Sequence, residues 1–474
     1  MRALFLLTLF CVAALARAEE PAPPRLRSTP EQRDELGVTV YSGGFGLIRE
    51  TRTLALTKGR SEVEFAGVAG TIQPETVQIH AVGAAPGLHV LEQSYQYDLL
   101  SPAKLLEKYV GRSVRVLRWS ETKGRDEERD AVVLSAGEPP ILRVGDEITW
   151  AFPGRISFPE IPKTLIAKPT LVWLVDSGAE RQKIEVSYLA GDLSWKADYV
   201  LVVNDTDTAG DLNGWVTLDN KSGAAWANAK VQLVAGDVNR VQPPVYKDRM
   251  IYAAEARTAV APPQFREEGL FEYHLYTLER PTTLLENEQK QIALLEASGI
   301  KVAKRLVLRG EPAYFRMQTG ELGATSKVAV SLEFENRENQ KLGMPLPKGI
   351  VRVYKRDKSG GRQFLGEDQI DHTPRDERVR IRVGDAFDVV GERKQMDYKV
   401  INSCRSESAW QIDVRNHKDE KVEVEIVEPA SGDWEIVSSS LPATKDDAHT
   451  FSFRVPVPAR GSTRVEYRVR VRWC

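Results

Sequence analysis

The segment Arg464–Trp473, RVEYRVRVRW, decides the fold class because its polarity alternates strictly along the chain. The apolar set is Val465, Tyr467, Val469, Val471 and Trp473, and the charged set is Arg464, Glu466, Arg468, Arg470 and Arg472. A period of two places one set on each face of a β-strand, and one buried face with one wet face is typical of an antiparallel sheet. The C-terminal region is therefore predicted to be a β-sheet.

Shorter alternating segments continue this pattern toward the N-terminus, for example at residues 38–41, 77–82 and 194–203. Glycine and proline separate them, and short strands at such spacing are typical of sandwiches and small barrels. The sequence predicts an all-β fold class, with several antiparallel β-sandwich or barrel domains. One short helix is expected after Ser101-Pro102, because serine is a good N-cap and proline suits the first helical position.

Residues 282–297 leave two alternatives open. Their Glu, Gln and Leu content suits a helix. Glu288 falls where an apolar residue of a helical stripe belongs, which favours a hairpin that turns at Asn287–Glu288.

The expected domain organisation follows from the proline-rich and charged interruptions of the strand pattern. It comprises a signal peptide at 1–18, a disordered tether at 19–35, an N-terminal β domain at 36–182 with a small β-barrel insert at about 108–152, a middle β domain at 183–325 and a C-terminal β-sandwich domain at 326–474.

The first residues resemble a cleaved export signal. Arg2 precedes the apolar run Leu4–Leu15, and Ala16-Arg17-Ala18 is a small-x-small cleavage site. No later stretch reaches the ~20 apolar residues of a membrane-spanning helix. We expect a periplasmic or secreted protein of a Gram-negative-type bacterium, with no transmembrane segment in the mature chain.

The charge composition is nearly balanced, with 65 Lys and Arg against 67 Asp and Glu. Because these charges are spread along the chain, nucleic acid is not an expected partner. A protein or another envelope component is expected instead.

Two cysteines, Cys404 and Cys474, follow the expected cleavage site. An oxidising compartment would permit a disulfide between them. The alternative is a pair of free thiols, because Cys474 ends the chain and is prone to fray.

The segment Gly366–Gln395 holds the one dense group of acid, base and possible metal-ligand side chains. Its candidates are Asp368, Asp371, His372, Asp376 and Glu377. Carboxylates with one imidazole could hold a cation or act as acid and base. The competing interpretation is a structured turn, because Asp and Thr-Pro suit turns and Arg375, Arg378, Arg380 and Arg382 follow closely. We expect no cofactor and no metal.

Trp226 is the candidate for an exposed aromatic side chain. It follows Gly223-Ala224-Ala225, which reads as a loop, whereas Trp195 and Trp215 lie in alternating strands where core positions are commoner.

Several motifs in order resemble one known family. They are LSWKADY at 193–199, GWVTLDN at 214–220, LVAGDVN at 233–239, PLPKG at 345–349, GEDQIDHTP at 366–374 and GDAFD at 384–388. Together they resemble the bacterial exported family of domain of unknown function 4139, which is distantly similar to mucoidy-inhibitor-A-like proteins. The resemblance implies a β-rich envelope protein and supplies no catalytic residue.

The sequence thus favours a non-catalytic binding, interaction or structural protein that uses sheet edges and loops. The alternative is a hydrolase or metal-binding protein that uses residues 368–377.

Overall fold

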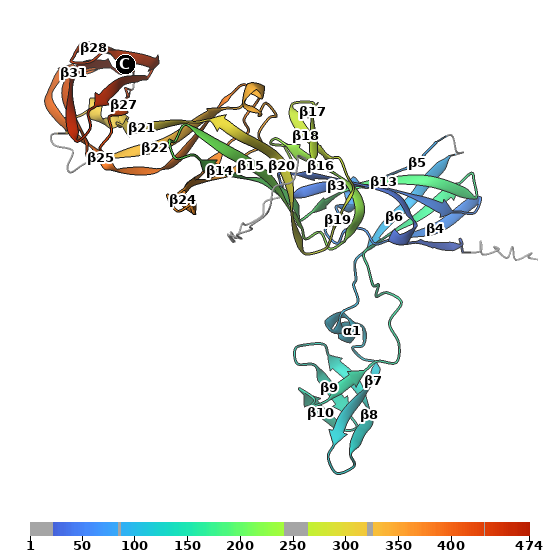
Figure 1. Cartoon of the computed structure of the whole chain (residues 1–474). Coiled ribbons are helices and arrows are strands. Elements are labelled where there is room, and N and C mark those ends of the chain that lie inside the picture. The colour runs from blue at the N-terminus through green and yellow to red at the C-terminus, as the bar shows by residue number, and fades with distance from the viewer. Residues whose placement is uncertain (1–21, 84–86, 241–263, 320–325, 431) are drawn as a thin grey trace, which may run out of the picture. The chain divides into compact units, whose positions relative to one another are not determined.

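The computed structural model describes residues 22–83, 87–240, 264–319, 326–430 and 432–474 (Figure 1). These residues form 31 strands and one α-helix, so the predicted all-β fold class is confirmed. The expected signal peptide at 1–18 lies outside the described residues. Within the described part of the chain, no helix has the length and apolar character needed to span a membrane.

The chain separates into two compact units. The first contains residues 1–36 and 48–190, and the second contains residues 37–47 and 191–474. The strands β2 (Arg33–Tyr41) and β3 (Phe45–Ala55) therefore contribute residues to both.

The first unit is built around the strand order β1-β4-β12-β6. The strands are β1 (Arg25–Ser28), β4 (Gly59–Ala66), β12 (Thr170–Ser177) and β6 (Leu88–Gln96), and β13 (Arg181–Gly191) pairs with β5 (Gln78–Ala81). Phe65 and Trp173 are almost fully buried, and their ring centroids lie 5.1 Å apart. Burial of these rings and of the alternating valines stabilises the unit.

The predicted disordered tether at 19–35 is wrong from Arg25 onward. Strand β1 pairs in parallel with β4, from Arg25 opposite Glu62 to Ser28 opposite Phe65. Arg25 forms ion pairs of 2.8 Å with both Glu62 and Glu64. The charged composition that suggested disorder is instead matched by the charges of the neighbouring strand.

A five-stranded sheet with its own core is inserted into the first unit. Its order is β10-β9-β8-β7-β11, with β7 (Ser113–Ser120), β8 (Arg125–Ser135), β9 (Ile141–Val144), β10 (Glu147–Trp150) and β11 (Arg155–Ser157). The expected helix is α1 (Pro102–Lys108), and the Ser101 hydroxyl accepts a hydrogen bond from the Lys104 amide at 3.2 Å. Tyr109, Val116 and Val133 are among the buried residues that form the core beneath the sheet.

The second unit contains a sheet of order β20-β15-β14-β23-β24. Its strands are β14 (Leu193–Val203), β15 (Ala209–Asn220), β20 (Glu288–Lys301), β23 (Gly349–Arg356) and β24 (Arg362–Ile370). Residues 282–297 are strands and not helix, because β19 (Thr282–Leu284) precedes a turn at Asn287, where φ is 56°, and β20 follows it. The two strands do not form a paired hairpin, since β19 pairs with β16 (Trp226–Ala235) and β20 pairs with β15.

Strand β16 also pairs in parallel with residues 37–41 of β2 and antiparallel with β18 (Tyr273–Leu278), which in turn pairs with β17 (Phe265–Leu270).

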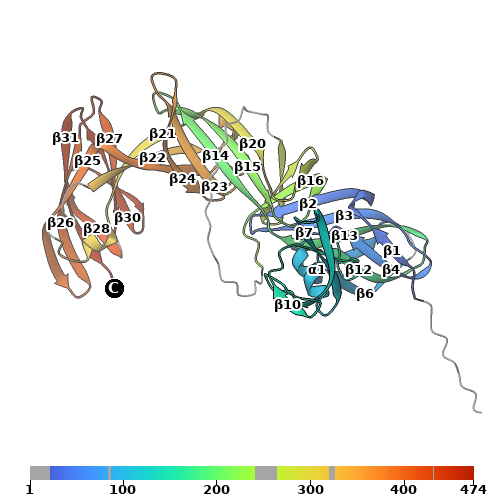
Figure 2. The same cartoon turned by 90° about the horizontal axis from the view of Figure 1, so that it is seen from below.

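The C-terminal sheet has nine strands in the order β28-β31-β26-β25-β22-β21-β27-β30-β29 (Figure 2). They are β21 (Ala303–Arg309), β22 (Ser326–Glu335), β25 (Arg378–Asn402), β26 (Arg405–Asn416), β27 (Val422–Pro429), β28 (Asp433–Ser439), β29 (Ala443–Asp447), β30 (Thr450–Val457) and β31 (Gly461–Arg472).

The alternation that decided the fold class appears directly in β31. Val465, Tyr467, Val469 and Val471 are buried in the C-terminal core, and Trp473 packs against it. The arginines of the other face bind carboxylates on neighbouring strands, such as Arg464 to Asp413 at 2.8 Å and Arg470 to Glu407 at 2.9 Å.

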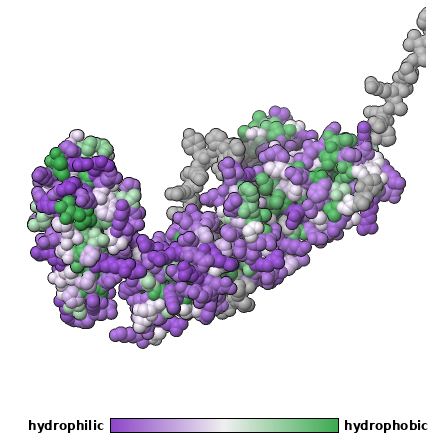
Figure 3. All heavy atoms as spheres, turned by 90° about the horizontal axis from the view of Figure 1, so that it is seen from above, coloured by the Kyte–Doolittle hydropathy of each residue, from purple (hydrophilic) through white to green (hydrophobic). Residues whose placement is uncertain are grey.

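The face of the molecule seen in Figure 3 is hydrophilic over most of its area, with hydrophobic residues in a few patches.

Cys404 and Cys474 form a disulfide, with their Cα atoms 5.4 Å apart. The backbone amide of Trp473 also donates a hydrogen bond of 3.1 Å to the carbonyl of Cys404. The disulfide joins the turn between β25 and β26 to the residue that follows Trp473.

Candidate functional site

The acidic cluster of the sequence lies at the end of β24 and in the loop that leads to β25. Asp368 is on β24, and its carboxylate accepts hydrogen bonds from the backbone amides of Gln369 at 2.9 Å and Arg382 at 2.7 Å. Asp371 is exposed, and its carbonyl accepts a bond from the Thr373 hydroxyl. The Asp368 carboxylate is therefore occupied by hydrogen bonds to backbone amides. Asp371 is an exposed residue of a turn.

The remaining three candidates have separate surroundings. The Nδ1 atom of His372 accepts a hydrogen bond of 3.2 Å from the backbone amide of Lys348. Partial burial lowers the pKa of His372, and the charge of Asp237 opposes that effect. Asp376 has a φ of 66°, and its carboxylate lies 3.8 Å from the guanidinium group of Arg337. The backbone carbonyl of Glu377 accepts a hydrogen bond from the backbone amide of Asn336.

Asn336, which the sequence did not single out, organises this loop. It is fully buried, and its side-chain amide donates to the carbonyls of Met344 at 2.9 Å and Pro374 at 3.0 Å. Its side-chain oxygen accepts from the Gly343 amide at 2.9 Å. One side chain thus replaces the backbone partners that the irregular loop lacks.

The four arginines near the cluster point to other partners. Arg375 donates to the Gly343 carbonyl at 2.7 Å, and Arg382 lies 3.0 Å from Asp385. Arg378 and Arg380 both approach Glu333. Among the described residues, no group of three or more His, Cys, Asp or Glu side chains is placed to hold a metal ion. The geometry supports the structured-turn interpretation.

The prediction that Trp226 is exposed is wrong. Trp226 has no exposed surface, and its Nε1 atom donates to the Ser222 hydroxyl at 3.2 Å. The side chain of Asn220 holds the loop before it, because its amide donates to the carbonyl of Ala224 at 2.9 Å. The chain therefore re-enters the sheet at Trp226, opposite Leu284 of β19.

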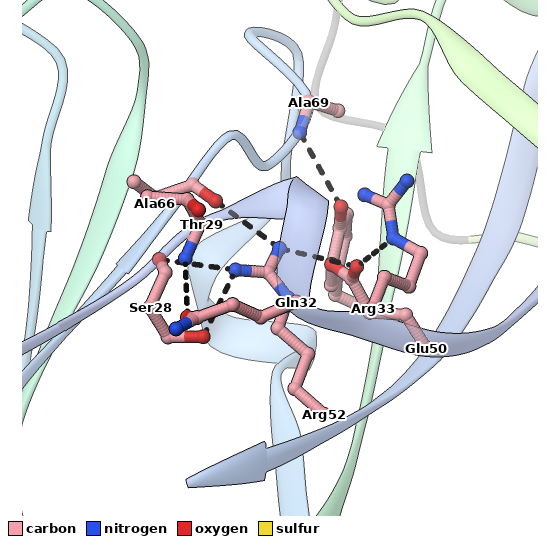
Figure 4. Close-up of polar contacts among 9 residues, drawn as sticks. Ser28, Thr29, Gln32, Arg33, Glu50, Arg52, Ala66 and Ala69 are labelled. Carbon is pink, nitrogen blue, oxygen red and sulfur yellow. Dashed lines mark hydrogen bonds and ion pairs between the residues drawn. The ribbon is translucent and has the colours of Figure 1, made fainter. Parts of the chain in front are cut away.

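A group of buried charged side chains in the first unit connects neighbouring strands (Figure 4). Arg52 lies beside Glu50 at 3.1 Å and over the ring of Phe65 at 3.6 Å, and Glu50 also binds Arg33. Arg52 also donates to the carbonyls of Ser28 and Ala66, both at 3.1 Å. Burial lowers the pKa of Arg52, and the charge of Glu50 opposes this. These contacts fasten β1 to the core of the first unit.

The inserted five-stranded sheet carries a cavity of about 400 Å³. Its lining residues come from the β7–β8 hairpin and the segment after β10, and they are Val116, Arg118, Trp119, Ser120, Glu121, Thr122, Glu127, Arg129 and Phe152. Cavities of this size hold small ligands. Trp119 is 61% exposed, which is unusual for so large an aromatic side chain in a strand.

The register of the hairpin explains how the polar groups meet. Arg118 lies opposite Glu127, and Val116 lies opposite Arg129, so one face carries both guanidinium groups and the carboxylate. A hydrogen bond from Lys123 and its positive charge lower the pKa of Glu127, so its carboxylate is charged at neutral pH. By the same register Trp119 lies on the other face of β7, opposite Asp126, so the lining takes its charged side chains from one face of the hairpin and Trp119 from the other.

Sequence reasoning missed this site, although it predicted a small β-barrel insert at about 108–152. The available indication was the position of Trp119 on the face of the strand opposite to Val114 and Val116, which supply the buried face. An aromatic residue on the outer face of such a strand is not covered by the core.

The comparisons with known proteins concern the other part of the chain. A family model described as a domain of unknown function (DUF4139) matches residues 184–474. A search of curated proteins gives no match. The matched segment includes all five strands of the sheet β20-β15-β14-β23-β24 and all nine strands of the C-terminal sheet, but not the inserted sheet with its cavity. The chain belongs to the family described as domain of unknown function (DUF4139).

Proposed function

We propose that this protein is an exported, non-catalytic binding protein of a bacterial cell envelope, and that it binds an oligosaccharide in the cavity of the inserted sheet. The observation that carries the proposal is the exposed Trp119 in a cavity of about 400 Å³ beside Arg118, Glu127 and Arg129. The export signal expected at the N-terminus and the Cys404–Cys474 disulfide favour an oxidising compartment.

The lining chemistry suits a sugar. The face of a pyranose ring exposes C–H groups that pack on the flat apolar face of an indole, while its hydroxyls need both donors and acceptors. Trp119 and Phe152 are the aromatic residues of the lining, and Arg118, Glu127 and Arg129 are its charged residues. A peptide would require deeper apolar pockets for its side chains.

The surroundings of the acidic cluster favour binding over hydrolysis. An acid–base pair must reach one substrate atom together. Here Asp368 is bound by backbone amides, and His372 is bound by Lys348.

A glycan array probed with the labelled protein tests the proposal. We expect signals from one structural class of glycan, lost in Trp119→Ala and kept in Trp150→Ala, which removes another exposed tryptophan of the same sheet but outside the cavity lining. An array without signals, or equal signals from the wild type and Trp119→Ala, overturns it. Binding of extended peptides that depends on Trp119 would overturn the ligand class.

A further inference from the structure

Three arginines converge on one buried carboxylate in the C-terminal sheet. Glu333 of β22 has 7% of its side chain exposed, and Arg380 of β25 lies 2.6 Å from it. Arg305 of β21 lies 3.3 Å from the same carboxylate, and Arg378 of β25 lies 4.0 Å from it. The neighbouring strands β21, β22 and β25 present these groups on one face.

The cluster has a surplus of positive charge. One carboxylate faces three guanidinium groups, each of which carries five N–H donors. Glu333 is enclosed, but Arg378 and Arg380 are 58% and 57% exposed and Arg305 is 38% exposed. Most of the donors therefore point to solvent and not to Glu333.

The other nearby carboxylates have cations of their own. Arg337 lies 3.2 Å from Glu335 and 3.8 Å from Asp376. Asp385 lies 3.0 Å from Arg382 and 3.6 Å from Lys327. Among the described residues, these carboxylates therefore do not neutralise the surplus positive charge of Arg305, Arg378 and Arg380.

We propose that Arg305, Arg378 and Arg380 form a binding site for a polyanion, a polymer that carries carboxylate or phosphate groups. Arg378 and Arg380 are two residues apart on one strand, so their guanidinium groups repeat at roughly 7 Å along β25. Guanidinium groups match both anions in a bidentate geometry. Glu333 is a positioning residue that orients the three side chains. This site is separate from the sugar cavity and does not rest on the proposed function.

A purely structural role would explain one arginine and not three. A single guanidinium neutralises Glu333, and Arg380 is close enough to do so. Arg378, at 4.0 Å and mostly exposed, adds little to that pair, because exposed ion pairs contribute little to stability.

The test uses two fluorescently labelled probes, poly-L-glutamate for carboxylate and inorganic polyphosphate for phosphate, titrated at low and physiological salt. We expect the wild type to bind at least one probe, more tightly at low salt. The double variant Arg378→Gln/Arg380→Gln should bind roughly tenfold more weakly. Arg378→Gln alone, whose ion pair is the longest, should weaken binding without lowering the melting temperature.

Arg464→Gln is the matched control, since Arg464 is also 57% exposed and ion-paired in the same sheet. It should bind as the wild type does, and so should Trp119→Ala. Binding of one probe alone identifies the anion, and binding of both identifies charge density as the determinant. The proposal is overturned if neither probe binds at low salt, if the double variant binds normally, or if Arg464→Gln loses binding equally.

Discussion

The side-chain amide of Asn336 donates a hydrogen bond of 3.0 Å to the backbone carbonyl of Pro374. This bond links the end of β22 to the loop that carries most of the acidic candidates of the sequence. It explains why a segment rich in catalytic residue types has the geometry of a folded turn. The side chains of Asp368, His372 and Asp376 contact different partners, and the buried Asn336 fixes the loop itself.

Replacing Asn336 by alanine should therefore destabilise the second unit. The change leaves the Met344 and Pro374 carbonyls and the Gly343 amide without their side-chain partner, which costs about 2–3 kcal/mol. Urea unfolding measures the loss. Asn339→Ala, at an exposed position three residues later, should change stability by less than about 0.5 kcal/mol. Equal stability of the two variants would show that the loop does not depend on Asn336.

Neutralising Glu50 should destabilise the first unit more strongly. Glu50→Gln leaves two guanidinium groups, of Arg33 and Arg52, without their common carboxylate, and breaking a buried pair in this way costs about 3–5 kcal/mol. Glu64→Gln removes a partly exposed partner of Arg25, whose own side chain is 57% exposed, and should cost less than about 1 kcal/mol. Chemical denaturation of both variants makes the comparison, and similar losses would contradict a structural role for the buried cluster.

Acid should weaken the contact of Asp207 with two lysines. Burial alone would raise the pKa of Asp207, but hydrogen bonds from Lys304 at 2.7 Å and Lys355 at 2.6 Å outweigh it, so the pKa is lowered. A carboxylate with a lowered pKa stabilises the fold fully above its unfolded pKa of about 3.9, and this stabilisation is lost as the pH falls below that value.

The stability difference between the wild type and Asp207→Asn should therefore be constant from pH 7 to pH 5 and shrink below about pH 4. Thermal unfolding across this range measures it. Asp205→Asn, at an exposed position in the same turn, is the control. A stability difference between the two proteins that stays constant down to pH 3 would contradict the ion pairs of Asp207 with Lys304 and Lys355.

Reduction of the disulfide should loosen the C-terminal sheet. The bond closes a separation of 70 residues, which in the chain-entropy model corresponds to about 4 kcal/mol. Cys474→Ser should lower the melting temperature, and a reducing agent should lower that of the wild type but not of the variant. The thiols can be titrated in an unfolded, unreduced chain that starts at Glu19 and so lacks Cys11. No free thiol is expected, and two free thiols would disprove the disulfide.

The strands were predictable where one face is buried and the other is wet. Residues 464–473 show this best, because their period of two is set by the core on one side and by paired charges on the other. Strand β1 was not predictable in the same way, since Arg25 and Arg27 are matched by charges on β4 that are remote in sequence. Composition alone cannot distinguish such a strand from a disordered segment.

The site was less predictable than the fold. A sequence shows which side chains are close along the chain, but Asp368 and His372 bind partners from three different segments. Trp226 looked exposed because small residues precede it, yet the Asn220 side chain holds that loop and β16 begins at Trp226 itself. Trp119 drew no notice because its exposure depends on which face of β7 packs on the core of the inserted sheet.

The most direct test of the proposed function is a titration of tryptophan emission with chitotetraose, cellotetraose and maltotetraose. The proposal predicts a saturable change in emission with at least one of these sugars. The change should disappear in Trp119→Ala and persist in Trp150→Ala, because only Trp119 lines the cavity. Emission that does not respond to any of the three sugars, or a response that survives in Trp119→Ala, would contradict the proposal.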